Sequence, residues 1–211
     1  MKKLEELKRK NDVAIFLGCG PSINNLDENF LDGKDVWANN NFILHPNIVP
    51  DFYHLELKEH RSGETIRALT SKKREHYKET NWILNQQRPY LLDAVKPEWF
   101  ENIFQYSGIP VYCVSSITII IQIMIKLGYQ KIYFAGVDLN TSEYFWTDNK
   151  NYNVPQIINS CKPDERDKYS IHPTAERDIH NWICSAGKAA KIEFINKSKG
   201  SLLETVLKNE Y

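Results

Sequence analysis

Short apolar runs alternate along this chain with stretches of helical pattern, and this alternation constrains the fold more than any other feature. The runs are rich in β-branched and aromatic residues and lie at 13–17, 35–38, 51–55, 81–85, 110–114, 131–137 and 191–196. The helical candidates are residues 1–12, 24–31, 59–79, 96–104, 115–128, 174–191 and 201–209. Strands that alternate with helices predict an α/β fold with a mostly parallel sheet. Because the strands are apolar throughout, we expect helices on both faces of the sheet.

The length of the chain fits one domain, and we expect residues 1–211 to form it. Residues 139–173 follow neither the strand period nor the helical period and are polar and rich in aromatic residues. Loops of this length are usually functional lids or disordered segments. This segment is therefore predicted to be a lid-like insertion within the domain.

The charge and cysteine content exclude several classes of protein. Lys plus Arg and Asp plus Glu number 27 each, which argues against a nucleic-acid-binding surface but leaves a local basic pocket open. The four cysteines are scattered without a CxxC pair, so no metal site is predicted. The apolar run at 117–125 is too short to span a membrane, and the charged N-terminus does not resemble a signal peptide. We therefore expect no transmembrane segment and a cytoplasmic location.

The first candidate site is the turn that follows the strand at 13–17. It reads Gly18, Cys19, Gly20, Pro21 and Ser22. In a parallel sheet, ligands bind at the carboxyl ends of the strands, and glycines let main-chain amides approach an anion. The third glycine of the dinucleotide fingerprint and the Lys of a phosphate-binding P-loop are both absent. The turn is read either as a phosphate- or sugar-binding loop or as a tight turn needed only for packing.

The second candidate site combines a helix start with a strand end. Ser115 and Ser116 open the helix predicted at 115–128, and the strand at 131–137 is followed by Asp138, with Gly136 just before it. A helix N-terminus favours anions, whereas a carboxylate at a strand end can hold a ribose, a metal or the neighbouring loop. For Ser115, a simple helix cap is the competing interpretation.

The third candidate is His172, which lies just before Pro173 at the entry to a predicted helix. A histidine there can serve as a general base, because its free pKa lies near neutrality. An exposed loop histidine without a catalytic role is the competing interpretation.

Four segments carry a resemblance to a known family: residues 17–23, 35–42, 115–139 and 169–179. In this order they resemble the bacterial sialyltransferases of glycosyltransferase family 42. They are also similar to the wider group that includes the MptE-like hydroxymethylpterin diphosphokinases. The resemblance implies a single Rossmann-like domain with a lid over the active site.

The resemblance also implies an activity and its residues. Such enzymes transfer a sugar from a nucleotide donor to an acceptor hydroxyl, with inversion and without a metal or other cofactor. His172 would be the general base, and Tyr144 and Tyr169 would stabilise the leaving phosphate. Asn40 and Ser115 or Ser116 would bind the nucleotide. The implied partners are a nucleotide-sugar donor and an acceptor among bacterial surface glycans. The implied location is the cytoplasm or the inner face of the membrane, and homo-oligomerisation is left open.

The chain departs from the family pattern at Cys19, His54 and Cys113, where the family has two asparagines and an arginine. Three functions therefore stay open. The first is a sialyltransferase-like glycosyltransferase. The second is an MptE-like diphosphokinase, which would need ATP and magnesium. The third is a nucleotide- or sugar-binding homologue without catalytic activity.

Overall fold

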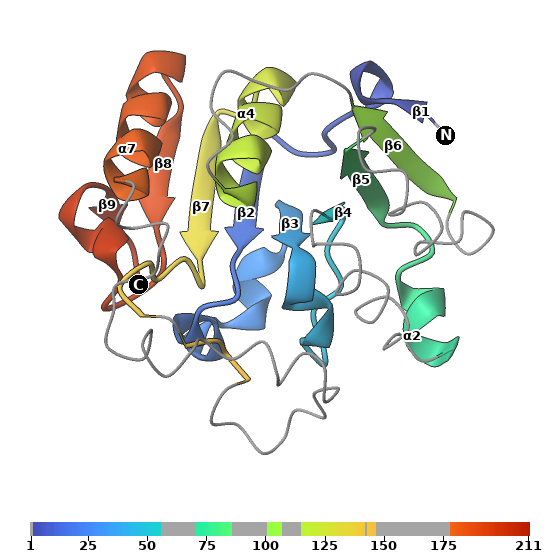
Figure 1. The fold of residues 1–211 in the computed structure, drawn as a ribbon, viewed down its shortest axis with the longest axis horizontal. Coiled ribbons are helices and arrows are strands. Elements are labelled where there is room, and N and C mark those ends of the chain that lie inside the picture. The colour runs from blue at the N-terminus through green and yellow to red at the C-terminus, as the bar shows by residue number, and fades with distance from the viewer. Residues whose placement is uncertain (1, 56–70, 86–100, 107–114, 142, 147–177) are drawn as a thin grey trace.

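The computed structural model describes residues 2–55, 71–85, 101–106, 115–141, 143–146 and 178–211. They form one sheet with the strand order β1-β6-β5-β4-β3-β2-β7-β8-β9, in which every neighbouring pair is parallel (Figure 1). The strands are β1 (Lys2–Lys3), β2 (Val13–Leu17), β3 (Asp35–Asn39), β4 (Phe52–Leu55), β5 (Asn81–Asn85), β6 (Asn102–Tyr106), β7 (Lys131–Ala135), β8 (Glu193–Asn196) and β9 (Lys208–Asn209). The predicted α/β class with a parallel sheet is confirmed.

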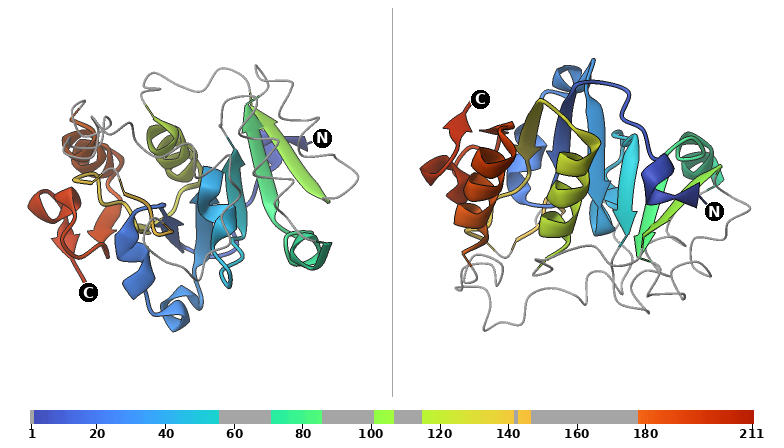
Figure 2. Two further views of the ribbon diagram at one scale, coloured as in Figure 1. Left: turned by 60° about the horizontal axis from the view of Figure 1, so that its bottom comes forward. Right: turned by 90° about the horizontal axis from the view of Figure 1, so that it is seen from above.

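The two faces of the sheet are covered by different elements. Helices α4 (Ser116–Leu127) and α7 (Ile179–Ala190) lie side by side on one face (Figure 2). The other face is covered by short 3-10 helices: η2 (Pro21–Asn25), η3 (Glu28–Leu31) and η4 (Asn40–Leu44). Tyr77, just after α2 (Ser71–His76), packs on this second face as well. Successive strand residues point to opposite faces, so both cores draw on the same strands.

Helix α4 confirms the helix predicted at 115–128. Ser115 is its N-cap residue, and Gly128 ends it in the left-handed conformation with φ 76°. The buried residues of the helix are five isoleucines together with Thr118 and Met124. Because α4 runs antiparallel to the strands, its N-terminus lies at the carboxyl ends of β2 and β3 (Figure 1).

Several predicted helices are wrong in type. Residues 102–104 were expected to be helical but belong to β6, where Ile103 and Phe104 are buried on opposite faces. Pairing with β5 therefore outweighs the local helical pattern. Residues 1–12 contribute β1 and the 3-10 helix η1 (Leu4–Glu6), in which Leu4 anchors the segment in the core.

Residues 24–31 and 201–209 also differ from the expected helices. Residues 24–31 form parts of the 3-10 helices η2 and η3, and residues 201–209 form η7 (Leu202–Thr205) and the edge strand β9. The strand predicted at 110–114 and most of the insertion at 139–173 lie outside the described residues.

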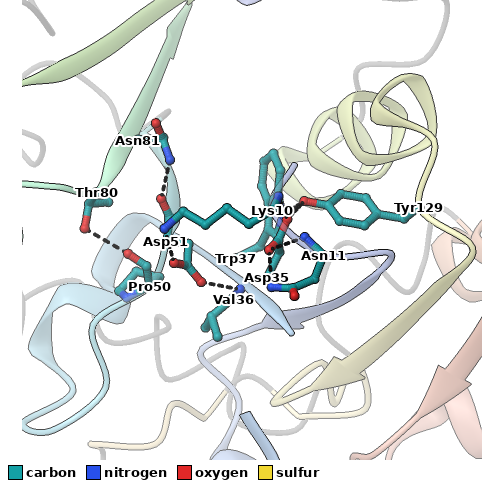
Figure 3. A network of polar contacts seen from close by, with 10 residues as sticks. All are labelled: Lys10, Asn11, Asp35, Val36, Trp37, Pro50, Asp51, Thr80, Asn81 and Tyr129. Atoms are coloured by element: carbon teal, nitrogen blue, oxygen red, sulfur yellow. Dashed lines mark hydrogen bonds and ion pairs between the residues drawn. The ribbon is translucent and has the colours of Figure 1, made fainter. Parts of the chain in front are cut away.

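A buried carboxylate organises the amino ends of the strands (Figure 3). Asp35, the first residue of β3, has no solvent-exposed surface. It accepts hydrogen bonds from the main-chain N–H groups of Lys10 at 2.8 Å and Asn11 at 3.0 Å. The Asn11 side chain donates at 2.8 Å and the Tyr129 hydroxyl at 2.7 Å. All four of these donors belong to the protein, so the Asp35 carboxylate is hydrogen-bonded without a ligand.

Asp51 extends this network to the next strands. Its carboxylate accepts from the main-chain N–H of Val36 at 2.9 Å and from the Lys10 ammonium at 2.8 Å. Its carbonyl accepts from the main-chain N–H of Asn81 at 2.8 Å. The segments that enter β3, β4 and β5 are thereby held in register (Figure 3).

Candidate functional site

Glycines hold the carboxyl ends of β2 and β7 in backbone contact. The N–H of Gly18 donates to the Ala135 carbonyl at 2.7 Å, and that of Gly20 donates to the Gly136 carbonyl at 2.8 Å. A Cβ atom on Gly18 would lie 2.3 Å from the Gly136 oxygen, and Gly136 itself has φ +68°. Only glycine fits these positions, which explains the glycines of both sequence motifs.

Asp138 holds the loop that follows β2. Its carboxylate accepts from the Ser22 N–H at 2.9 Å, and the Ser22 hydroxyl donates to its other oxygen. A Cβ atom on Gly20 would lie 2.4 Å from this carboxylate. Burial raises the pKa of Asp138, and the two bonds from Ser22 oppose that rise. Asp138 thus has a positioning role here, and contact with a nucleotide stays a prediction for this residue.

The main-chain N–H groups of residues 18–22 differ in whether they already donate a hydrogen bond. Those of Gly18, Gly20 and Ser22 donate to the protein, and Pro21 has no N–H. Pro21 begins η2, where its fixed φ suits a first helical position. Within the described part of the chain, Cys19 is the loop residue whose N–H finds no acceptor. Ligand binding by this loop stays a prediction.

The start of α4 and the end of β3 meet at the same edge. Asn40, which begins η4, has a left-handed backbone with φ 48°. Its side-chain amide donates to the Ser116 hydroxyl at 3.2 Å. Ser115 forms a capping box with Thr118, and its buried hydroxyl makes no further hydrogen bond among the residues that the structure covers. The structure thus places Asn40 beside Ser116, and nucleotide binding by Asn40 and the serine pair stays a prediction.

Tyr144 lies against the first loop. The N–H of its neighbour Phe145 donates to the Cys19 carbonyl at 2.9 Å, and the Asn24 side chain donates to the Phe145 carbonyl at 3.0 Å. The Tyr144 ring stacks on Trp146 with centroids 4.6 Å apart. The start of the predicted insertion is therefore fixed to the glycine loop by main-chain contacts.

Two departures from the family pattern are visible in the structure. Burial raises the pKa of the Cys19 thiol to about 12, so this side chain stays a neutral thiol near neutral pH. His54, on β4, is fully buried, and its Nε2 lies 2.8 Å from the Tyr106 hydroxyl. Neither Cys19 nor His54 therefore supplies the side-chain amide of the asparagine that the family has at its position.

His172, Tyr169 and Cys113 lie outside the described residues. Convergence of His172 and Tyr169 with Gly20 and Ser116 therefore stays a prediction. Sequence reasoning missed Tyr53 and Tyr106, since each is joined to the site through contacts that only the folded sheet creates.

One cavity in the described residues lies away from this edge of the sheet. A cavity of about 310 Å³ lies between the N-terminal segment and the end of α4, lined by Leu4, Leu7, Arg9 and Ile123 among others. Among the described residues, no group of three or more His, Cys, Asp or Glu side chains is arranged to hold a metal ion. Within the same residues, no helix combines the length and hydropathy needed to cross a membrane.

Comparison with known proteins gives structural matches without sequence matches. No family profile matches the sequence, and neither does any curated protein. The sialyltransferase Cst-I of Campylobacter jejuni aligns with a TM-score of 0.61 and 16% identity over 97% of this chain and 82% of that one.

Two structures of the sialyltransferase CstII align as well, each with a TM-score of 0.61. One holds the substrate analogue CMP-3FNeuAc and is 17% identical over 93% of this chain and 86% of that one. The other holds a trisaccharide acceptor and CMP and is 15% identical over 92% of this chain and 84% of that one. The chain therefore has the fold of the bacterial sialyltransferases Cst-I and CstII.

Proposed function

We propose that the chain is a glycosyltransferase that transfers a sugar from a nucleotide-sugar donor to a glycan hydroxyl. The shared fold supports a transferase of the sialyltransferase type, because CstII structures hold a CMP-linked substrate analogue and an acceptor trisaccharide. The transfer would invert the anomeric carbon and would need no metal. The acceptor would be a bacterial glycan.

The observation that carries this proposal is the Asn40–Ser116 contact at the carboxyl edge of the sheet. It joins the end of β3 to the N-terminus of a 12-residue helix, where the helix dipole favours an anion. The Cys19 N–H, which has no acceptor in the described chain, and the buried Ser115 hydroxyl, which makes no hydrogen bond there beyond the capping box, lie on the two elements that border this edge. A nucleotide phosphate supplies the acceptors that such donors lack.

The chemistry assigns further roles to the predicted residues. The nucleotide leaves as a phosphate anion, so hydroxyl and amide donors are needed where negative charge develops. Tyr144 and Tyr169 would supply hydroxyls to that phosphate. His172 would take the proton of the acceptor hydroxyl as it attacks the sugar.

The test is thermal unfolding with CMP, CDP, UDP, GDP and ATP, each with and without magnesium. A ligand at about 100 times its Kd stabilises the folded state by about 2.7 kcal/mol. For a domain of this size that corresponds to a rise in Tm of roughly 5–10 °C. The proposal predicts a rise with a pyrimidine nucleotide, with CMP expected to give the largest, and no need for magnesium.

Two variants sharpen this test. Asn40→Ala should reduce the rise in Tm at a fixed CMP concentration, whereas Asn81→Ala, which removes a bond to the Asp51 carbonyl at the other end of the sheet, should preserve it. A rise only with ATP and magnesium would contradict the proposal and favour the diphosphokinase. If CMP binds but a glycan acceptor is never glycosylated, the chain is a binding homologue without catalytic activity.

A further inference from the structure

The hydroxyl of Tyr53 bridges the two ends of the turn that carries Asn40. Tyr53 lies on β4 and is fully buried on the face opposite to α4. Its hydroxyl donates to the Asn40 carbonyl and accepts from the Ile43 N–H at 2.8 Å. One side chain thus satisfies an acceptor and a donor of the 3-10 helix η4.

The residue held in this way is in an unusual conformation. Asn40 has φ 48°, in the left-handed region, which glycine adopts readily and which Asn and Asp adopt more often than other residues do. Such a conformation persists only where its surroundings fix it. On one side the turn is bound by Tyr53, and on the other the Asn40 side chain reaches across the sheet edge to Ser116.

We propose that Tyr53 is a positioning residue for nucleotide binding, which acts by holding the Asn40 turn so that the Asn40 amide faces the start of α4. This inference rests on the proposed function for its ligand. The buried Tyr53 hydroxyl contacts the backbone of the Asn40 turn, so Tyr53 is not itself a catalytic residue.

The Tyr53 hydroxyl is suited to a fixed, neutral role. Burial raises its pKa well above the ordinary value for tyrosine. The hydroxyl therefore keeps its proton and donates to Asn40 at every pH at which the protein is handled. Phe at this position would keep the ring and remove only the two bonds to the turn.

Tyr77 offers a matched control. It is also fully buried, its ring lies 6.1 Å from that of Tyr53, and both rings pack on Trp82. Its hydroxyl reaches the Ile48 carbonyl at 3.5 Å and does not touch the Asn40 turn. Tyr77→Phe therefore removes a buried hydroxyl from the same aromatic cluster without changing the proposed contact.

The experiment measures CMP affinity by calorimetry for the full chain, Tyr53→Phe, Tyr77→Phe, Asn40→Gly and the double variant Tyr53→Phe/Asn40→Gly. We expect Tyr53→Phe to raise Kd about tenfold and Tyr77→Phe to change it less than about twofold. In the Asn40→Gly background, Tyr53→Phe should have no further effect, because glycine adopts the left-handed conformation unaided and the amide is gone. Equal losses for the two Phe variants, or full additivity with Asn40→Gly, would overturn the inference.

A second readout in the ligand-free protein separates this inference from the proposed function. Hydrogen exchange of the Ile43 amide and the NMR shift of the Asn40 side-chain amide should change in Tyr53→Phe and stay constant in Tyr77→Phe. If the unaltered chain binds no CMP, the proposed function fails, and these two signals alone decide whether Tyr53 positions Asn40. Unchanged signals in Tyr53→Phe would refute it.

Discussion

At the amino ends of the strands, the buried carboxylate of Asp35 accepts from Lys10, Asn11 and Tyr129 (Figure 3). At the carboxyl ends, the buried hydroxyl of Ser115 has no partner among the described residues beyond its capping box. Both ends carry polar groups removed from water, and burial of such groups is costly unless they are bonded. The carboxylate at the amino end is satisfied by the protein itself, whereas the carboxyl end, where we propose that a nucleotide binds, holds a hydroxyl without a further partner among the described residues.

Left-handed backbone occurs at both ends of the strands. At the amino ends, Gly33, Gly128 and Lys191 precede β3, β7 and β8 with φ of 70°, 76° and 57°. The carboxyl end contains the close contact of Gly18 with Gly136 and the left-handed turn at Asn40. The two ends therefore differ in their hydrogen bonding and not in the presence of left-handed backbone.

The largest expected effect is at the amino end. Asp35→Ala would leave the Tyr129 hydroxyl and two main-chain N–H groups without acceptors, and we expect a loss of about 3–5 kcal/mol in the free energy of unfolding. Chemical denaturation measures this, with the exposed Asp32→Ala as the control. CMP affinity of the folded fraction should not change. A loss under about 1 kcal/mol would show that this end is not the stabilising one.

The next effect is steric and lies at the carboxyl end. Gly20→Ala would place a Cβ atom 2.4 Å from the Asp138 carboxylate, and overpacking of this kind costs about 1–3 kcal/mol. The displaced loop should also lose CMP binding. Gly33→Ala meets no atom within 4 Å and carries only the cost of its positive φ, so its binding should be normal. Normal CMP affinity in Gly20→Ala would separate the loop from the site.

Ser116→Ala tests the site with little effect on the fold. The variant loses the contact with Asn40, and we expect Kd for CMP to rise about tenfold, or about 1.4 kcal/mol. The free energy of unfolding should stay within about 0.5 kcal/mol, as for most substitutions outside the core. Calorimetry and denaturation on the same sample measure both, with the exposed Thr205→Ala as the matched control. A large stability loss with unchanged Kd would make Ser116 a structural cap only.

The smallest effect is a pH dependence at Asp138. Because burial raises the pKa of this carboxyl in the folded protein, its contribution to stability is largest below the unfolded pKa and falls as pH rises through the folded pKa. Unfolding free energies of the unaltered chain and Asp138→Asn should therefore diverge between pH 7 and pH 4, in favour of the unaltered chain at low pH. A difference that moves the other way would contradict the raised pKa.

The sequence predicted those parts of the molecule that depend on local signals. The helix at 115–128 has a serine cap, an apolar face and a terminal glycine, and each of these acts within a few residues. The glycines at 18 and 20 were identified because a turn after a strand requires them. Residues 102–104 were misassigned because pairing with β5 is a long-range effect.

The site was predicted less completely for the same reason. Ser22 and Asp138 were both chosen as candidates, but their direct bond joins segments that are far apart in sequence. Tyr53 was not chosen, because nothing in its own strand indicates a hydroxyl bridging Asn40 and Ile43. Contacts between strand ends follow from the order of strands in the sheet, which local patterns do not specify.

The most direct test of the nucleotide site is an NMR titration of the amide-labelled chain with CMP in the absence of magnesium. We expect chemical-shift changes at Cys19, Asn40 and Ser116, with no changes at Asn11 and Tyr129 at the opposite end of the sheet. Changes confined to the amino end, or to the cavity beside Leu4 and Arg9, would contradict it.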